Sequence, residues 1–123
     1  MQFNKEIRME KMNVKPASGK LGVLCVGLGA VTSTFMTGVL MARKGLAKPV
    51  GSMTQYDKMR VGRGENKKYL HYGEIVPLAS LNDIVFGAWD VYPANAYESA
   101  VNAEVSQEKD INPVKDELEK IVP

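Results

Sequence analysis

The apolar positions in the first half of the chain fall into two patterns, which predict a strand followed by a helix. Residues 21–26 form an uncharged, mainly apolar run with glycine at its borders, which is typical of a short buried strand. Over residues 30–44 the apolar side chains recur at helical spacing, with Met36 and Leu40 on one stripe. Gly45 then ends this predicted helix.

The stretch 46–81 shows no sustained periodicity, and glycine and proline interrupt it repeatedly. Short strands are expected within it at 58–61 and 69–72. An irregular connection of this length is uncommon inside a compact domain and usually serves a purpose. We therefore interpret it as one long insertion between regular elements.

Regular structure is expected to resume at residues 84–90, an apolar run that ends in an acid and is typical of a second buried strand. A helix is expected from about 94 to 105, where closely spaced alanines favour tight packing. Pro113 then opens an acidic helix over 114–121, since proline in the first turn loses no helical hydrogen bond.

This order of elements is a βαβα unit. It predicts an α/β fold, a partial Rossmann-like domain of the NAD-binding type with a long insertion between the first helix and the second strand. Residues 1–19 mix charge with methionine and close with turn formers, which indicates an N-terminal tail. Residues 20–123 are then the N-terminal part of a truncated domain, and we expect so small a unit to cover its apolar helix only in part.

A glycine pair lies at the turn between the first strand and the first helix, the context in which such a motif has chemical meaning. Gly27 allows a tight turn, and Gly29 lets a pyrophosphate approach the backbone and the free N–H groups of the helix. Thr32 takes the place of the third small residue and can add a hydroxyl hydrogen bond. The pair is equally compatible with simple helix–strand packing, so both interpretations stay open.

Dinucleotide-binding folds usually carry an acid for the ribose hydroxyls about 20 residues after the glycines. No Asp or Glu occurs between Ala30 and Tyr56. Asp90 instead ends the second strand, and the insertion explains its distance from the glycines. Since parallel strands end at the same edge of a sheet, Asp90 is expected near the glycine turn. A polar strand end or a helix cap is the alternative interpretation.

Composition excludes several other classes of protein. A chain of 123 residues with 45% apolar and 24% charged residues is typical of one small soluble domain. A net charge of +2 gives no argument for nucleic acid or membrane. Cys25 has no disulfide partner and no activating neighbour, and together with the lone His71 it cannot build a usual metal site. We therefore expect no metal and no Cys–His catalysis.

One uncharged run, residues 21–42, is long enough to span a bilayer. It contains four glycines and four hydroxyl residues, which lower its hydropathy. We therefore expect no membrane span, and a single-span membrane protein with a soluble tail is kept as an alternative.

Charge is distributed unevenly along the chain. Between Arg43 and Lys68 there are eight basic residues and two acids, whereas from Glu98 onward there are seven acids and three lysines. Solvated surface is the ordinary interpretation of both runs. The functional alternative is that Arg60 and Arg63 line a site near phosphate groups.

Several short stretches resemble the myo-inositol-1-phosphate synthase family. They occur in one order at familiar separations: Gly51-Ser52-Met53-Thr54-Gln55, Arg60-Val61-Gly62, Ile75-Val76-Pro77 and Asp83-Ile84-Val85-Phe86-Gly87-Ala88-Trp89-Asp90. With the glycine turn and its helix, the resemblance runs from about Gly19 to Pro123. The GS-x-TQ and GxWD-type stretches are far more specific than a glycine pair.

The resemblance implies an enzyme of inositol and phospholipid biosynthesis that converts glucose 6-phosphate to myo-inositol 1-phosphate. In this family NAD oxidises C5, an enol forms, an aldol step closes the ring, and the same NADH reduces the product. Members are cytoplasmic homotetramers whose Rossmann domain is interrupted by a catalytic and tetramerising domain. The implied cofactor is NAD, the implied substrate is glucose 6-phosphate, and no nucleic-acid or membrane partner is implied.

The resemblance also assigns site residues. Gly27, Gly29 and Ala30 match the family's NAD phosphate loop, and Asp90 matches the acid that binds the ribose of the cofactor. Many eukaryotic members carry a glycine and an asparagine pair after the GxG, where this chain has Ala30-Val31 and is one residue shorter. Val31 is therefore expected to contribute only its backbone.

Two further departures limit what can be carried over. Ala88 replaces the glycine usual before the tryptophan, which is a modest change. The family's catalytic lysines lie well downstream, and no lysine of this chain matches them. No catalytic residue is therefore assigned, and this portion alone is expected to be inactive. A stand-alone nucleotide-binding module without catalysis is the alternative function.

Overall fold

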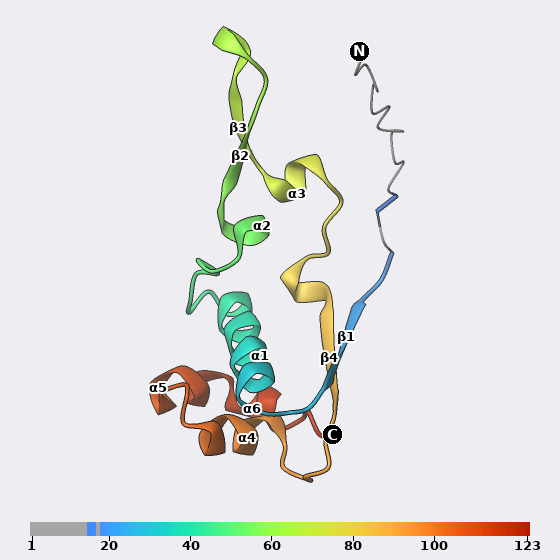
Figure 1. The fold of residues 1–123 in the computed structure, drawn as a ribbon, viewed down its shortest axis with the longest axis vertical. Coiled ribbons are helices and arrows are strands. Elements are labelled where there is room, and N and C mark those ends of the chain that lie inside the picture. The colour runs from blue at the N-terminus through green and yellow to red at the C-terminus, as the bar shows by residue number, and fades with distance from the viewer. Residues whose placement is uncertain (1–14, 17) are drawn as a thin grey trace, which may run out of the picture.

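A computed structural model describes residues 15, 16 and 18–123 of the chain (Figure 1). The predicted N-terminal tail, residues 1–19, lies mostly outside these described residues. The regular structure begins directly after it, at Leu21.

Two parallel strands form the sheet on which the site depends (Figure 1). β1 spans Leu21–Val26, as predicted, and β4 spans Ile84–Trp89, so that it ends one residue before Asp90. The register between them is continuous and places the last residues of the two strands, Val26 and Trp89, opposite each other. The two carboxyl ends therefore share one edge of the sheet, as the predicted α/β class requires.

The helix α1, Ala30–Arg43, follows the glycine turn and ends one residue earlier than predicted. Met36 and Leu40, which share one apolar stripe of the helix, are 0% and 5% exposed. The neighbouring stripe is covered unevenly, because Val39 is buried whereas Phe35 is 43% exposed. Phe35 nevertheless contacts the ring of Phe86 on β4 edge to face, which joins the helix to the sheet.

The hydrophobic core lies between α1 and the helices of the C-terminal segment (Figure 1). These elements are α4 (Ala96–Ala103), α5 (Glu108–Ile111), the 3-10 turn η3 (Asn112–Val114) and α6 (Lys115–Leu118). Their side chains Ile111, Val114 and Leu118 are at most 1% exposed and belong to the same cluster as Met36. The C-terminal segment thus covers more of α1 than we expected of so small a unit.

α4 is shorter than the predicted helix over 94–105, and local interactions explain both of its ends. Asn95 and Glu98 form a reciprocal capping box, which fixes the first turn. Glu104 adopts a left-handed conformation (φ 54°), which stops the helix.

The predicted acidic helix over 114–121 is wrong in extent. It is reduced to the single turn α6, with the separate turns α5 and η3 before it. Pro113 lies in the first turn of η3, which agrees with the preference of proline for that place. Val114 has φ −121° and ψ 17°, outside the helical region, so these turns do not merge into one helix.

The insertion between α1 and β4 projects away from the parallel sheet (Figure 1). Its regular part is an antiparallel hairpin of β2 (Lys58–Val61) and β3 (Lys68–His71). β2 has the predicted bounds, and β3 begins and ends one residue earlier than predicted. Short helical turns complete the insertion: α2 (Met53–Tyr56), η1 (Gly64–Asn66), α3 (Tyr72–Ile75) and η2 (Leu81–Asp83).

The parallel sheet is covered on one face only within the described residues. Phe86 and Ala88 point toward α1 and the core. The side chains that alternate with them on β4 and their neighbours on β1 are between 51% and 84% exposed: Leu24, Val26, Val85 and Trp89. Parallel sheets are ordinarily covered on both faces, which makes this an unusually apolar free surface.

The uncharged run 21–42 is divided between β1 and α1. Among the described residues, no helix has both the length and the apolar character needed to cross a bilayer.

Arg43 fastens the end of α1 to the beginning of β4. Its Nε donates to the carbonyl oxygen of Leu81 at 2.5 Å, and an Nη donates to the carbonyl oxygen of Ile84. The guanidinium also lies 5.6 Å from the centre of the Phe86 ring. A single partly buried side chain therefore links three points of the fold.

Replacing Arg43 with Met is expected to destabilise the protein by about 1–3 kcal/mol, because two carbonyl groups lose their charged donor while the apolar stem is kept. Urea unfolding followed by circular dichroism measures this. Lys48→Met, at an exposed position whose side chain makes no hydrogen bond among the described residues, is the matched control and should change stability by less than about 0.5 kcal/mol. Equal stabilities of the two variants would refute the role of Arg43.

Candidate cofactor-binding site

Asp90 joins the two strand ends at the carboxyl edge of the sheet. The main-chain N–H of Leu28, in the turn after β1, donates to Asp90 Oδ2 at 2.6 Å. The N–H of Tyr92 donates to Asp90 Oδ1 at 3.0 Å. The parallel pairing also extends past β1, because Gly27 N–H donates to the carbonyl of Trp89 at 2.7 Å. Leu28 in the glycine turn and Asp90 are 62 residues apart in sequence, and they are thus in direct contact.

The same hydrogen bonds set the charge of the acid. The N–H groups of Tyr92 and Leu28 hold the pKa of the Asp90 carboxyl below its usual range, because they stabilise the ionised form. Partial desolvation opposes this effect without reversing it. Asp90 is therefore an anion at neutral pH. Each of its oxygens accepts one backbone bond and keeps lone-pair capacity for another donor.

The glycine turn leaves the start of α1 open. Gly27 has φ +92°, a conformation that other residues rarely adopt. Gly29 is the N-cap of α1 and supplies no side-chain cap; the first helical bond runs from Ser33 N–H to the carbonyl of Gly29 at 2.9 Å. The N–H groups of residues 30–32, which lie between Gly29 and Ser33, have no partner within the helix. A Cβ built on Gly29 would meet no atom within 4 Å, so open space lies in front of these donors.

Two hollows flank Asp90. One, of about 400 Å³, lies between the glycine turn and α4, and its lining includes Gly29, Ala30 and Asp90. The other, of about 450 Å³, lies beside the strand ends, and its lining includes Gly27 and Asp90. The acid therefore stands between two spaces, each of which is large enough for part of a nucleotide.

The structure brings together most of the residues predicted for this site. Gly27, Gly29, Ala30 and Asp90 all line one of the two hollows. Val31 and Thr32 do not line either; the side chain of Val31 is 84% exposed, and Thr32 is half-buried in the first turn. These two residues face the site only through their main-chain N–H groups.

Sequence reasoning missed four residues at the site. Leu28 and Tyr92 act through the N–H groups that bind Asp90. Ser99 and Asn102, three residues apart on α4, line the hollow between the glycine turn and α4. Two signals were available: an Asp bonding the N–H two residues later is a common turn, and polar residues three apart in a helix share one face.

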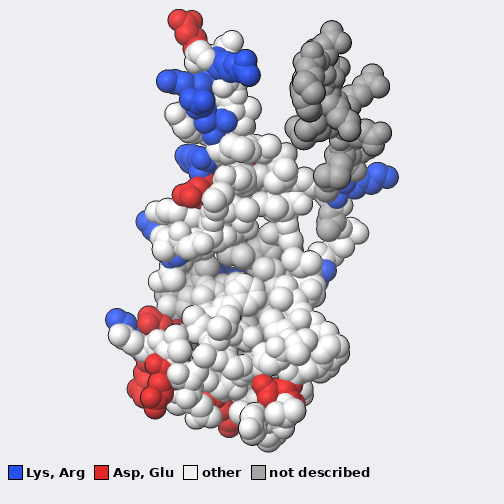
Figure 2. Space-filling model, in the orientation of Figure 1, with Lys and Arg blue, Asp and Glu red and all other residues white. Residues whose placement is uncertain are grey.

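The functional alternative for the basic run, a positive lining near phosphate groups, is not found at this site. No Lys or Arg lines either hollow among the described residues. Arg60 and Arg63 belong to the hairpin and its tip, at the far end of the molecule from the glycine turn (Figures 1 and 2). The main-chain N–H groups at the start of α1 are therefore the positive groups at the site itself.

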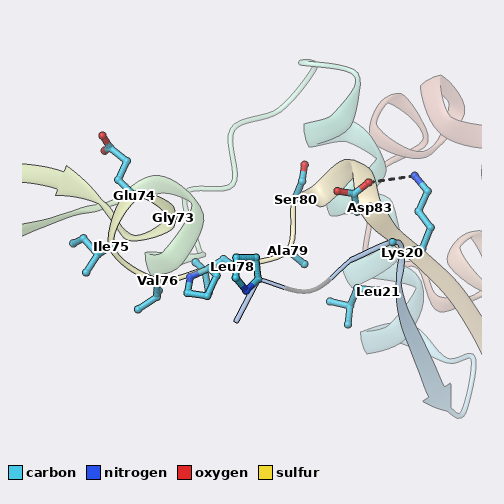
Figure 3. A pocket seen from close by; sticks show the side chains of 13 residues that line it. Lys20, Leu21, Gly73, Glu74, Ile75, Val76, Leu78, Ala79, Ser80 and Asp83 are labelled. Carbon is cyan, nitrogen blue, oxygen red and sulfur yellow. Dashed lines mark hydrogen bonds and ion pairs between the residues drawn. The ribbon is translucent and has the colours of Figure 1, made fainter. Parts of the chain in front are cut away.

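A further hollow of about 530 Å³ lies at the opposite, amino end of the strands (Figure 3). Lys20 and Asp83 form an ion pair of 3.3 Å at one side of it, and the apolar side chains of Ile75 and Val76 lie at the other. Ligands of open α/β sheets bind outside the carboxyl ends of the strands. The candidate cofactor site is therefore the one at Asp90.

The fold and this site define a class of protein before any relative is considered. A parallel βαβ unit with a glycine turn before the helix and an acid after the second strand is a Rossmann-like dinucleotide-binding unit. A family model for the NAD-binding portion of myo-inositol-1-phosphate synthase matches residues 21–123. The chain belongs to the myo-inositol-1-phosphate synthase family, and NAD is the cofactor of this domain. The resemblance and the fold class predicted from the sequence are confirmed.

Individual relatives agree with this assignment. Inositol-3-phosphate synthase 1 of Bacteroides thetaiotaomicron is 57% identical over 114 residues, which cover 92% of this chain and 26% of the relative. Inositol-3-phosphate synthase 1 of Oryza sativa subsp. japonica is 33% identical over 116 residues, which cover 85% of this chain and 23% of the relative. A crystal structure of inositol-3-phosphate synthase from Caenorhabditis elegans has a TM-score of 0.72 at 29% identity. The match covers 89% of this chain and 24% of the chain in that structure. The chain spans about a quarter of the length of these proteins.

The lowered pKa of Asp90 predicts how stability depends on pH. A carboxyl whose pKa is lower in the folded than in the unfolded state contributes its full stabilisation above the unfolded pKa of about 3.9 and loses it as the pH falls through the folded value. The difference in unfolding free energy between wild type and Asp90→Asn should therefore be constant from about pH 7 to about pH 5 and shrink below about pH 4. Urea titrations across this range measure it. A difference that persists unchanged at low pH would contradict the assignment.

Proposed function

We propose that residues 20–123 are the N-terminal part of a Rossmann-type domain that binds NAD at the glycine turn and Asp90. The pyrophosphate would lie on the N–H groups at the start of α1, beside Gly27 and Gly29. The ribose hydroxyls would donate to the Asp90 carboxylate. This proposal rests above all on the bond from Leu28 N–H to Asp90, which brings the acid and the glycine turn to one edge of the sheet.

The free groups of the site support this arrangement. The N–H groups of Ala30, Val31 and Thr32 point out of the helix end without helical partners, and the positive end of the helix dipole favours an anion there. Val31 offers only its backbone, because its side chain is exposed and apolar. Thr32 likewise offers its main-chain N–H in the first turn. Asp90, ionised and with unused lone pairs, suits a pair of hydroxyl donors.

We further propose that the whole protein converts glucose 6-phosphate to myo-inositol 1-phosphate by oxidation, aldol cyclisation and re-reduction. NAD, when bound, supplies the hydride acceptor and then the hydride donor. The part played by this chain's residues is to hold and orient the cofactor. No residue of the chain is proposed as catalytic or as a metal ligand. A cytoplasmic homotetramer without nucleic-acid or membrane partners completes the proposal.

Asp90→Ala is expected to weaken NAD binding by about 1–3 kcal/mol, or roughly 5- to 150-fold in Kd, because the ribose loses a charged acceptor. Trp89 is the only tryptophan and stands next to the acid, so quenching of its emission during NAD titration reports on the site. Asp83→Ala is the control, since it removes an acid from the amino end of the same strand. Equal Kd values for the two variants would contradict the proposed ribose contact.

Gly29→Ala is expected to lower NAD affinity at least about tenfold, because a methyl group would stand where the pyrophosphate must approach. The fold has room for this methyl group, so the stability loss should be about 1 kcal/mol or less, as for a changed N-cap. Gly38→Ala, in the middle of α1 and also unobstructed, is the matched control and should bind NAD normally. Unchanged affinity in Gly29→Ala would argue against a phosphate at this turn.

The activity is tested on the complete product of the gene. With glucose 6-phosphate and a catalytic amount of NAD, inositol phosphate should accumulate without net NADH, and Asp90→Ala should reduce the rate. Binding of NAD without any conversion would favour the alternative of a nucleotide-binding module that lacks catalysis.

A further inference from the structure

The hollow between the glycine turn and α4 has a polar wall that the proposed contacts to NAD leave unused. Two neutral side chains of α4, Ser99 and Asn102, line this space of about 400 Å³ together with Asp90 and the start of α1. Ser99 is half-buried, and Asn102 is exposed. Because the two residues are three apart in a helix, they share one face of it. The acid and this pair therefore border the same space.

The polar groups of the pair are free to bind a ligand. Within the described part of the chain, the side-chain hydrogen bonds at α4 belong to other residues. Asn95 and Glu98 cap the first turn, and the hydroxyl of Tyr97 donates to the C-terminal segment. The Ser99 hydroxyl and the Asn102 amide make no hydrogen bond among these residues. Both groups offer donors as well as acceptors, so the hollow has free donors on its α4 side.

α4 holds the pair in a fixed position. Ala96 and Ala100 are buried and belong to the hydrophobic core. The Ala96 N–H donates to the carbonyl of Ile121 at 2.9 Å, which ties the first turn of α4 to the segment after α6. The capping box that begins at Asn95 fixes the same turn. A ligand that binds the α4 side chains therefore does not have to order the helix that carries them.

The proposed NAD site determines which part of the cofactor lies in this hollow. Its lining includes Gly29, Ala30 and Asp90, whereas the hollow on the other side of the acid is lined by neither Gly29 nor Ala30. A ligand with its pyrophosphate on the start of α1 and a ribose at Asp90 must therefore pass through the space beside α4. In Rossmann-like units the ribose at this acid is the one whose 2′-hydroxyl is phosphorylated in NADP, which is the adenosine ribose.

The hydrogen-bonding capacity of a ribose exceeds what the acid alone can satisfy. Each ribose hydroxyl is both a donor and an acceptor. Asp90 is ionised and only accepts, so it pairs with the hydroxyl protons and leaves the hydroxyl oxygens without a donor. Asp90 is also the only charged residue among those that line the hollow. The donors that the hydroxyl oxygens still need are present in the same lining, on Ser99 and Asn102.

We propose that Ser99 and Asn102 donate hydrogen bonds to the hydroxyls of the adenosine ribose and so complete the ribose site from the side of α4. This role rests on the proposed function, since NAD must lie across the glycine turn and Asp90 for its ribose to reach α4. The hydroxyls then lie between an acceptor at the end of the sheet and donors on a helix. Both of their hydrogen-bonding capacities are used.

The test compares two ligands by titration calorimetry of the complete product of the gene, freed of NAD. ADP keeps the adenosine ribose and the pyrophosphate, whereas 2′,3′-dideoxy-ADP lacks both ribose hydroxyls. Wild type should bind ADP more tightly. In Ser99→Ala with Asn102→Leu, ADP binding should weaken about fivefold or more, as for the loss of at least one hydrogen bond, while dideoxy-ADP binding should stay unchanged. The ratio of the two Kd values should therefore shrink by the same factor, because the variant and the analogue remove the same contact.

This ratio separates a contact from a merely structural role. A variant that only reshapes the hollow or loosens α4 would weaken both ligands alike, and an unchanged ratio would overturn the proposal. So would ADP binding as tight as that of wild type. Ser106→Ala with Asn82→Leu is the matched control, because neither residue lines a hollow at Asp90. The control should bind both ligands like wild type.

Failure of the proposed function gives a different result. If wild type binds neither NAD nor ADP, the NAD site itself is wrong, and the ribose contacts of α4 are refuted with it. If wild type binds NAD and Asp90→Ala weakens that binding, whereas the double variant at Ser99 and Asn102 binds NAD and ADP normally, the cofactor site stands. Only the role of α4 is then refuted.

Discussion

The contact between the Leu28 N–H and the Asp90 carboxylate is the interaction on which the site depends. It closes the edge where β1 and β4 end, and it can form only because the two strands are parallel and in continuous register. A parallel pair requires a crossover connection, and α1 with the long insertion provides it. The charge of the acid follows from the same contact, since the backbone donors that hold Asp90 in place also keep it ionised. Geometry and electrostatics of the site therefore have one cause.

The C-terminal segment makes this arrangement stable enough to exist. A two-stranded sheet with one helix buries little apolar surface. Ile111, Val114 and Leu118 complete the core around Met36, and α4 also forms one wall of the hollow beside Asp90. The C-terminal segment thus both completes the core and helps to shape the candidate cofactor site. The opposite face of the sheet stays apolar and exposed, which fits a chain that spans about a quarter of its relatives.

The basic side chains of this molecule lie away from its candidate cofactor site. The basic residues between α1 and β4 gather on a hairpin remote from the glycine turn, and the hollows at Asp90 contain no Lys or Arg among the described residues. The groups available to an anion at the turn are instead the main-chain N–H groups at the start of α1. The distribution of charge along the sequence therefore does not mark the hollows at Asp90, whereas the two glycines of the turn line them.

The sequence by itself determined the regular elements nearest the site, because apolar runs and glycine turns act over a few residues. Local pattern predicted the elements β1, α1 and β4. Together with the family resemblance, it also predicted that Gly27 and Asp90 lie near each other. Only the tertiary structure decided the rest. It has separate turns where a helix over 114–121 was expected, and it places the basic residues of the hairpin away from the site. It also shows that the main-chain N–H of Tyr92 donates to Asp90. These outcomes depend on contacts between segments distant in sequence, which no local pattern contains.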